Sequence, residues 1–370
     1  MFRLTHPDVR DDNAMHTRLS WYEKVSRDLR PAKYRIARRI ACQIDLDETP
    51  DETLWKEHAR LSASARALLN RLDLGELDLT KLSRAPVSFL DLKVKLLNRM
   101  IRRCTFCEWK CRVDRVSAVK KGACRLDSTS RVSTWFPHFG EEPPLVGRGG
   151  SGTIFFSSCT LRCAFCQNWD ISQDPLSGAP VDSRQLALMI KSLRADGVLN
   201  INFVGGEPTP NLHTIVEAMN QLNDLNVPML WNSNMYCSEE AMQILADLID
   251  IWLPDFKYGN NKCALRLSKV PRYFEVVARN HEFAQIDGDM IIRHLVLPNH
   301  LECCTKPVLR WISEHCPRAL VNIMSQYHPD YLVSAEHSKY ADITRRPTAE
   351  EMRAAYDCAE AVGLVYSPVS

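Results

Sequence analysis

Short apolar runs alternate along the second half of the chain with longer segments whose apolar residues recur at helical spacing. The runs predict six strands, at 153–157, 199–204, 229–231, 251–253, 291–297 and 320–324. Between the second and third runs, the residues that fall on one helical face are Leu212, Ile215, Val216, Met219 and Leu222. Strands that alternate with helices in this way are typical of an α/β fold with a parallel sheet.

Three regions of different character follow one another along the chain. Residues 1–85 carry helical apolar spacing at 21–42 and at 53–72, which predicts a helical N-terminal extension. Residues 86–145 are rich in cysteine and are expected to form a metal-binding connector. Residues 146–370 contain the alternating pattern and are expected to form the core.

The composition is that of an ordinary soluble protein, with 45% apolar and 25% charged residues among 370. A net charge of +2 gives no electrostatic argument for nucleic-acid binding, and no apolar run predicts a membrane span. Fourteen cysteines, several in closely spaced groups, favour metal binding in a reducing compartment over disulfide bonds. Since the first residues also lack the apolar segment of a secretory signal, we expect a cytoplasmic protein.

Cys159, Cys163 and Cys166 are spaced C-x3-C-x2-C directly after the first predicted strand. Thiolates bind soft metals, and an iron–sulfur cubane held by three cysteines keeps one iron free for an outside ligand. Zinc is the alternative, but structural zinc sites have four protein ligands, and no further Cys or His follows closely. The spacing therefore favours a [4Fe–4S] cluster, while a distant fourth ligand or a catalytic zinc with an open position keeps zinc open.

Polar and flexible residues follow the next three strands, where those strands end: Gly205, Gly206, Glu207, Asn234, Asp255 and Lys257. Because chemistry in βα folds gathers at the carboxyl ends of the strands, we expect these residues and the three cysteines to converge on one mouth. The glycines either permit close backbone approach to a ligand or form a plain turn. Asp255 and Lys257 point the same way in an extended chain, either to bind a ligand or to form a surface ion pair.

Arg293 lies inside the fifth apolar strand, where an unpaired charge is costly. Its guanidinium either binds a carboxylate of a ligand or pairs with Glu207 or Asp255. The next residue, His294, has the opposite parity, so we expect it to face the helices rather than the interior.

Four blocks of the chain resemble, in the same order, the radical S-adenosylmethionine (radical SAM) enzymes. They are the cysteine motif with Phe165, Gly205-Gly206-Glu207-Pro208, Asp255-Phe256-Lys257, and Arg-His-Leu-Val-Leu-Pro at 293–298. Within that family the chain most resembles a branch of uncharacterised iron–sulfur proteins related to the pyruvate formate-lyase activating enzymes, in which the runs 140–144 and 152–156 also recur. The resemblance implies an open, partial (β/α)6 barrel of the TIM type.

The resemblance also implies the cofactors and the reaction. The amino and carboxylate groups of S-adenosylmethionine would chelate the free iron, and reduction would yield a 5′-deoxyadenosyl radical that abstracts hydrogen from a substrate. The residues then expected to bind the cofactor are Gly205, Gly206, Glu207, Asn234, Asp255, Lys257 and Arg293. The substrate stays open, a glycine in a protein backbone being one candidate by analogy with activating enzymes, and no catalytic residue is assigned.

A second cysteine group precedes the first and consists of Cys104, Cys107, Cys111 and Cys124. Four ligands make a closed site, which zinc and a second iron–sulfur cluster fit equally well. Activating enzymes carry their extra clusters after the three-cysteine motif, so this group departs from their pattern. The cysteines that lack ligand spacing, and that we expect to be buried thiols, are Cys42, Cys237, Cys263, Cys303, Cys304, Cys316 and Cys358.

Residues 99–125 contain nine Arg or Lys against two acidic residues. We expect this segment to dock a small electron-donor protein of the flavodoxin or ferredoxin type, although a solvated face around a metal site would have the same composition. Two other functions fit the cysteines: a non-catalytic iron–sulfur electron carrier, and a zinc-ribbon protein that binds nucleic acid through this segment. An electron carrier needs no ligand pocket, so Glu207, Asp255 and Lys257 favour the enzyme.

Overall fold

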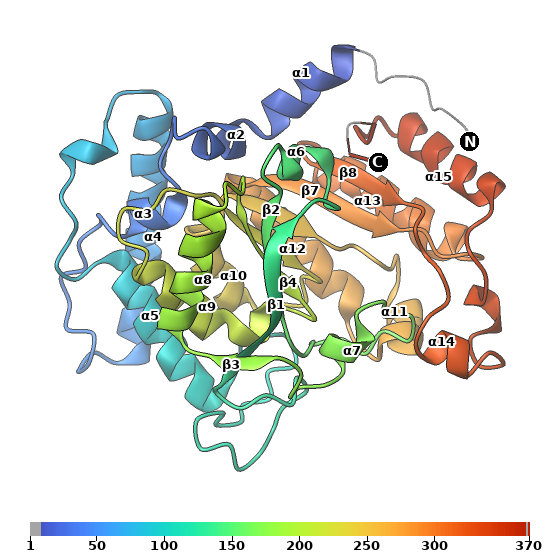
Figure 1. Ribbon diagram of the computed structural model, residues 1–370, viewed down its shortest axis with the longest axis horizontal. Helices are drawn as coiled ribbons and strands as arrows, with labels where there is room; N and C mark the ends of the chain where they lie inside the picture. Colours follow the sequence, from blue (N-terminus) through green and yellow to red (C-terminus); the bar gives the residue numbers. More distant parts are fainter. Residues whose placement is uncertain (1–8, 368) are drawn as a thin grey trace.

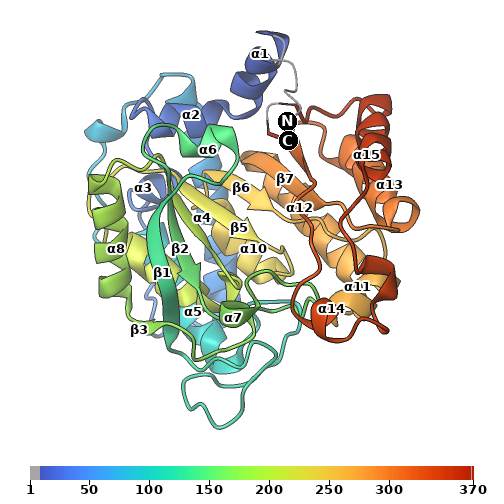
Figure 2. The same cartoon turned by 45° about the vertical axis from the view of Figure 1, so that its right-hand side comes forward.

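The computed structural model describes residues 9–367 and 369–370, and its centre is an eight-stranded sheet in the order β3-β1-β2-β4-β5-β6-β7-β8. Six neighbouring strands run parallel: β2 (Ser151–Phe156), β4 (Ile201–Gly205), β5 (Met229–Ser233), β6 (Ile251–Pro254), β7 (Asp289–Leu295) and β8 (Leu320–Met324). Two antiparallel strands extend one edge: β1 (Ser130–His138) and β3 (Ala179–Val181). Helices pack around the outer side of the curved sheet (Figure 1, Figure 2).

The predicted fold class is confirmed, because six parallel strands with helices between them make an open (β/α)6 barrel. The six predicted strands coincide with β2 and β4 to β8 to within a few residues. The strands β1 and β3 were not expected, and β1 falls in the region predicted to be a connector. Pro137 lies within β1, and its residues do not alternate regularly between buried and exposed, so the strand lacks a period-two signature.

The helices of the core follow the strands as the apolar spacing predicts. They are α8 (Ser183–Ala195), α9 (Leu212–Asn220), α10 (Glu239–Ala246), α11 (Asn261–Ser268), α12 (Tyr273–Asp287), α13 (Lys306–His315) and α15 (Ala349–Ala361), with short helices α6 (Pro143–Val146), α7 (Trp169–Ser172) and α14 (Leu332–Ala335). Local signals set their ends: Asp182 and Gln185 form a capping box at the start of α8. No helix in the described part of the chain is long and apolar enough to cross a membrane.

The N-terminal extension is helical, as predicted, and consists of α1 (Val9–Arg18), α2 (Ser20–Ser26), α3 (Lys33–Ala37) and α4 (Asp51–Asp73), followed by α5 (Phe89–Met100). Most of its buried apolar side chains belong to the same core cluster as the barrel, and Leu19 and Tyr22 pack with strand residues of the barrel in a second cluster. Buried Asp250, at the start of β6, fixes the junction by accepting hydrogen bonds from Trp21 Nε1 and the Lys33 amide, each at 3.0 Å.

A buried ion pair ties the helical region to the core at a second point. Lys93 on α5 is fully buried, and its ammonium lies 2.8 Å from Asp247 Oδ2 and 2.8 Å from His58 Nε2. Asp247 follows α10 and also accepts from Ser62 Oγ at 2.9 Å. Buried charges persist only when paired, so this contact depends on both elements being in place.

Removal of one partner should therefore destabilise the whole molecule. We predict that Asp247→Ala lowers the free energy of unfolding by about 3 kcal/mol, because it leaves the Lys93 ammonium buried without a counter-charge. Asp73→Ala, which removes an exposed ion pair with Lys24 at 2.6 Å, should cost less than about 1 kcal/mol. Urea unfolding followed by circular dichroism measures both, and equal effects would contradict the structural role of Asp247.

Candidate functional site

A cavity of about 480 Å³ opens at the carboxyl ends of the parallel strands. All the residues predicted to hold the cluster or the cofactor line it: Cys159, Cys163, Cys166, Gly205, Gly206, Glu207, Asn234, Asp255, Lys257 and Arg293. The predicted convergence on one mouth is therefore what the fold produces. Phe165 lines the same cavity, and its ring packs edge-on against the buried Tyr258 and Tyr327.

The cysteine turn after β2 is shaped by its backbone conformation and held by a neighbouring helix. Ser158, which precedes the first cysteine, adopts a left-handed backbone with φ 70°. Further along the turn, the amides of Arg162 and Ala164 donate hydrogen bonds of 2.9 and 2.7 Å to the carbonyls of Ser268 and Leu267, at the end of α11. The positions of the sulfurs are thus set by backbone contacts with a neighbouring helix.

Each sulfur of the turn lies beside a polar side chain that can donate a hydrogen bond. The pairs are Ser268 Oγ with Cys163 Sγ at 3.0 Å, Ser172 Oγ with Cys166 Sγ at 3.2 Å, and Asn234 Nδ2 with Cys159 Sγ at 3.5 Å. Such donors stabilise thiolate ligands. Three thiolates with such donors can hold an iron–sulfur cluster that keeps one iron open.

Gly205 and Gly206 are required by a close approach of neighbouring backbone segments. Gly205 has φ 120°, and a Cβ there would lie 2.2 Å from the Phe156 amide and carbonyl. A Cβ on Gly206 would lie 2.0 Å from the carbonyl oxygen of Ser158. The close approach is therefore to the end of β2 and the cysteine turn, which a side chain at either position would displace.

Glu207 is almost fully buried and is hydrogen-bonded within the chain. Its Oε1 accepts from Thr209 Oγ1 at 2.6 Å, Ser233 Oγ at 2.7 Å and the Thr209 amide at 3.2 Å. Among the described residues its Oε2 accepts one hydrogen bond, from the Asn234 amide at 2.9 Å, which leaves this oxygen able to accept another bond at the cavity wall. Burial raises the pKa of Glu207 despite these bonds.

Asp255 lies between two cations at the mouth. Lys257 Nζ is 2.7 Å from its Oδ2 and Arg293 Nε is 3.0 Å from its Oδ1. Burial opposes ionisation of Asp255, but the charges of Arg293 and Lys257 outweigh it and lower its pKa. Of the alternatives for Arg293, pairing with Asp255 is present, and the guanidinium also lines the cavity. His294 faces the helices, as its parity predicts, and contacts Thr305 Oγ1 at 2.9 Å.

Two adjacent carboxylates that we did not predict as site residues, Glu141 and Glu142, line the other side of the cavity. Glu141 accepts from Asn202 Nδ2 at 3.0 Å and lies 3.7 Å from Arg293. Burial opposes its ionisation, but His138 and Arg293 outweigh burial and lower its pKa, whereas burial raises the pKa of Glu142. The run 140–144 contains the signal that could have found them, two acidic residues next to a strand end.

Several buried polar atoms at this end of the barrel have no partner within the described chain. Glu142 Oε2, Asn202 Oδ1 and Asn232 Nδ2 are inaccessible to solvent and make no hydrogen bond. Glu142 and Asn232 line the cavity. Unsatisfied buried groups are costly, so their presence here indicates a polar ligand.

The connector packs directly against the cysteine turn. Ser158 Oγ donates to the Cys124 carbonyl, and Trp109 Nε1 donates to the Thr160 carbonyl at 2.8 Å. Cys107 pairs as an isolated β-bridge with Cys237, on the loop after β5. Burial raises the pKa of Cys107, and the nearby thiols of Cys124, Cys104 and Cys111 raise it further.

The prediction that the remaining cysteines are buried thiols is wrong for three of them. Cys303 is exposed, and Cys263 and Cys358 are partly exposed. Cys263 and Cys303 lie beside Cys304 and His300, a group formed by two separate helices. Because the two helices are far apart in the sequence, no short spacing between these residues predicts that they meet.

The chain is similar to known proteins over most of its length. Residues 153–312 match the family model described as the Radical SAM superfamily. An uncharacterized protein of Methanocaldococcus jannaschii is 42% identical over 357 residues, which cover 94% of this chain and 98% of that protein.

Two solved structures are also similar to this chain. Streptococcus suis SuiB bound to S-adenosylmethionine has a TM-score of 0.41 and 14% identity over 56% of this chain and 47% of SuiB, so the match spans less than half of SuiB. A domain of pyruvate-formate lyase-activating enzyme from Bacteroides vulgatus has a TM-score of 0.36 and 15% identity over 45% of this chain and 96% of the domain.

The carboxylates of the cavity give a testable titration. The contact with Glu141 raises the pKa of His138, and burial opposes this only in part. We predict that Glu141→Gln lowers the pKa of His138 toward its usual value, because the imidazolium loses its counter-charge. NMR titration of ring-labelled histidine measures the change, with Glu142→Gln as the matched control that leaves the His138 pKa in place. An unaltered His138 titration in Glu141→Gln would contradict the pairing.

Proposed function

The chain belongs to the radical SAM superfamily, and we propose that it cleaves S-adenosylmethionine reductively to a 5′-deoxyadenosyl radical that abstracts hydrogen from a substrate at the mouth of the barrel. The single observation that carries the proposal is the cavity itself, where three cysteines share one wall with charged and polar residues from the ends of four strands. An electron carrier would need the sulfurs but not this lining.

Cys159, Cys163 and Cys166 would hold the [4Fe–4S] cluster. When bound, the cluster supplies one iron with an open coordination position and the electron that the cleavage requires. The donors beside each sulfur and the unpartnered polar atoms at the cavity fit a polar cofactor of this kind.

The remaining lining residues would orient the cofactor and exclude water. Glu207 Oε2 is suited to accept from an ammonium group, a charge-assisted contact. The Lys257 ammonium and the Arg293 guanidinium already share Asp255 and would offer their remaining donors to carboxylate or hydroxyl groups. Phe165 contributes an apolar wall between the second and third cysteine.

A protein segment is the substrate class that we favour, in line with the resemblance to activating enzymes. Exposed aromatic side chains adjoin residues of the mouth: Phe136 and Phe139 flank the cavity residue His138 in the sequence, and Trp169 follows the cavity residue Asn168. The ring of Trp169 stacks on that of Tyr331, with the centroids 5.5 Å apart. Exposed apolar groups around a polar cavity are typical of binding sites for partners larger than the cavity. Glu141 and Glu142, with opposite pKa shifts, would contact the substrate.

The connector would carry electrons to this site. We propose that Cys104, Cys107, Cys111 and Cys124 bind an auxiliary iron–sulfur cluster, because this group packs directly against the cysteine turn, where a second cluster would pass electrons to the first. A flavodoxin- or ferredoxin-like donor would dock on the exposed cations around it: Arg102, Arg103, Arg112, Lys120, Lys121 and Arg125. Arg115 does not contribute, since its guanidinium is buried against the Asp127 and Pro210 carbonyls.

The enzyme activity has a direct test. Full-length protein purified without oxygen should release 5′-deoxyadenosine from S-adenosylmethionine with dithionite, and Cys163→Ala should lower the rate at least a hundredfold, because a cluster ligand is lost. Cys358→Ala, which removes a partly exposed thiol on α15, is the control and should keep the rate. Iron without any 5′-deoxyadenosine would favour the electron carrier, and equal rates in the two variants would refute the site.

The docking surface can be tested with two different reductants. We predict that Lys120→Glu/Lys121→Glu slows turnover several-fold when reduced flavodoxin supplies the electrons and leaves turnover with dithionite unchanged, because only the protein donor is steered by charge. Lys81→Glu/Arg84→Glu, which reverses two exposed cations in the linker between α4 and α5, is the matched control. Equal slowing in both double variants would place the donor elsewhere.

A further inference from the structure

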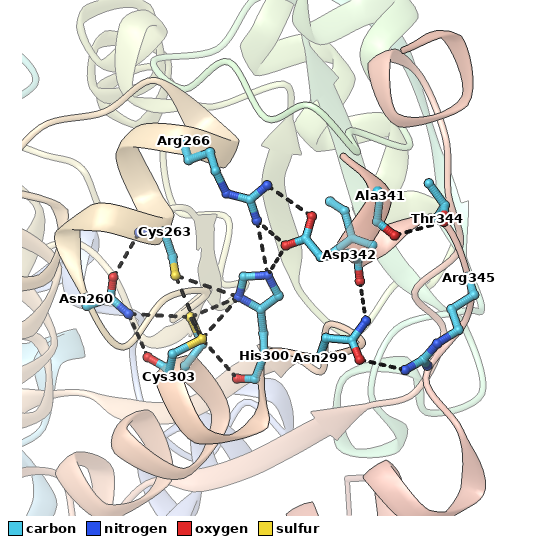
Figure 3. Close-up of polar contacts among 12 residues, drawn as sticks. Asn260, Cys263, Arg266, Asn299, His300, Cys303, Ala341, Asp342, Thr344 and Arg345 are labelled. Atoms are coloured by element: carbon cyan, nitrogen blue, oxygen red, sulfur yellow. Dashed lines mark hydrogen bonds and ion pairs between the residues drawn. The ribbon is translucent and has the colours of Figure 1, made fainter. Parts of the chain in front are cut away.

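Outside the cavity, four potential ligand atoms converge at one point (Figure 3). They belong to Cys263, His300, Cys303 and Cys304, and all lie within 4.8 Å of one another. Cys303 Sγ is 3.9 Å from both Cys263 Sγ and Cys304 Sγ. The Nδ1 atom of His300 is 3.7, 3.3 and 3.8 Å from the sulfurs of Cys263, Cys303 and Cys304 respectively. None of the four lines the cavity.

Two helices bring these residues together. His300 directly precedes a π-helical turn, η4 (Leu301–Thr305), which contains Cys303 and Cys304, so three ligands lie three and four residues apart on one helical face. Cys263 lies in the first turn of α11. Turns of this rare type are frequent at functional sites.

The helices α11 and η4 approach each other closely, and particular residues of the sequence allow this approach. A Cβ on Gly259 would lie 2.9 Å from the carbonyl oxygens of both Cys303 and Cys304, so only glycine allows the contact. Asn260 caps α11 through the Cys263 amide at 2.8 Å and donates from Nδ2 to the Cys303 carbonyl at 2.7 Å. Backbone contacts therefore hold the four ligand atoms in place before any ion binds.

We propose that Cys263, His300, Cys303 and Cys304 bind one zinc ion. Zn–S bonds of about 2.3 Å and a Zn–N bond of about 2.0 Å in a tetrahedron separate the sulfurs by about 3.8 Å, and sulfur from nitrogen by about 3.5 Å. The sulfur–sulfur separations of 3.9 Å and the sulfur–nitrogen separations of 3.3 to 3.8 Å in the structure match these values. The sulfurs are too far apart for a disulfide, whose S–S bond is about 2.05 Å, and Cys3His with no free position is a structural zinc site.

The surroundings of His300 complete such a site. Its Nε2 lies 2.9 Å from Asp342 Oδ2 and 3.3 Å from a guanidinium nitrogen of Arg266. Because the carboxylate only accepts, it favours the tautomer with the proton on Nε2, which leaves the lone pair of Nδ1 toward the sulfurs. Arg266 pairs with the same carboxylate. A carboxylate that orients a ligating histidine is the usual second layer around zinc, and a zinc ion with three thiolates carries a net negative charge that the guanidinium of Arg266 offsets.

The ion would brace the cysteine turn of the cavity. It would fix the first turn of α11 to η4. At the other end of α11, backbone carbonyls accept hydrogen bonds from the amides of Arg162 and Ala164, and Ser268 Oγ donates a hydrogen bond to Cys163 Sγ. One short helix thus joins the two centres. The zinc site itself does not depend on the proposed reaction.

Metal analysis of the full-length protein tests the proposal. We expect that Cys303→Ser/Cys304→Ser contains about one zinc ion fewer per chain than the wild type, because the site loses two of its four ligands, while iron content stays unchanged. Cys358→Ser, a thiol outside the group, is the matched control and should keep its zinc. Equal zinc in the wild type and the double variant would overturn the proposal, whether or not the protein cleaves S-adenosylmethionine.

A second readout does not rely on the double variant folding. Cobalt(II) added to chelator-treated wild-type protein should give thiolate-to-cobalt charge-transfer and ligand-field bands of a tetrahedral site, and His300→Ala should shift these bands because the nitrogen ligand is lost. The same single variant retains all three sulfurs. Identical cobalt spectra in wild type and His300→Ala would show that the ion binds elsewhere and would contradict the site.

Discussion

The close approach between the ends of β2 and β4, which pair side by side in the sheet, is the constraint on which the rest of the site depends. Gly205 and Gly206 let the two backbones approach to a distance at which a Cβ would overlap the Phe156 amide or the Ser158 carbonyl. This close approach positions the start of the cysteine turn, and the end of α11 positions its middle through two backbone hydrogen bonds. The sulfurs are consequently positioned by main-chain packing, which is more rigid than side-chain contact.

Charge balance in the cavity follows from the same arrangement. Asp255, Lys257 and Arg293 come from the ends of adjacent strands, and Glu141 approaches Arg293 from the loop after β1. In a buried site each charge requires a partner, so movement of one of these residues would leave the charge of another buried and unpaired. The network is therefore pre-organised, and the unpartnered oxygen of Glu142 marks where it stays incomplete.

The sequence alone predicts those parts of the molecule that show local periodicity or a short motif. The parallel strands, the core helices and the cysteine turn carry such signals, and the residues at the strand ends were expected to meet because parallel strands share one edge. The strand β1, which lies between β3 and β2, was missed because Pro137 and irregular exposure obscure its period. Glu141 and Glu142 were missed because their inward direction depends on that strand.

Long-range contacts account for the remaining errors. Cys263 lies forty residues before Cys303, and only the packing of α11 on η4 brings them together. Arg115 looked like a surface cation, yet it is buried against backbone carbonyls. In both cases the partner is a main-chain group or a distant helix, and neither leaves a pattern in the sequence.

The central claim is that the three cysteines of the turn hold a cluster with one iron free for S-adenosylmethionine. Electron paramagnetic resonance of the reduced, anoxically purified protein tests it most directly, recorded before and after the nucleotide is added. The account predicts a reduced [4Fe–4S] signal whose g values shift when S-adenosylmethionine binds. Protein without iron, or a cluster signal that the nucleotide leaves unchanged, would contradict it.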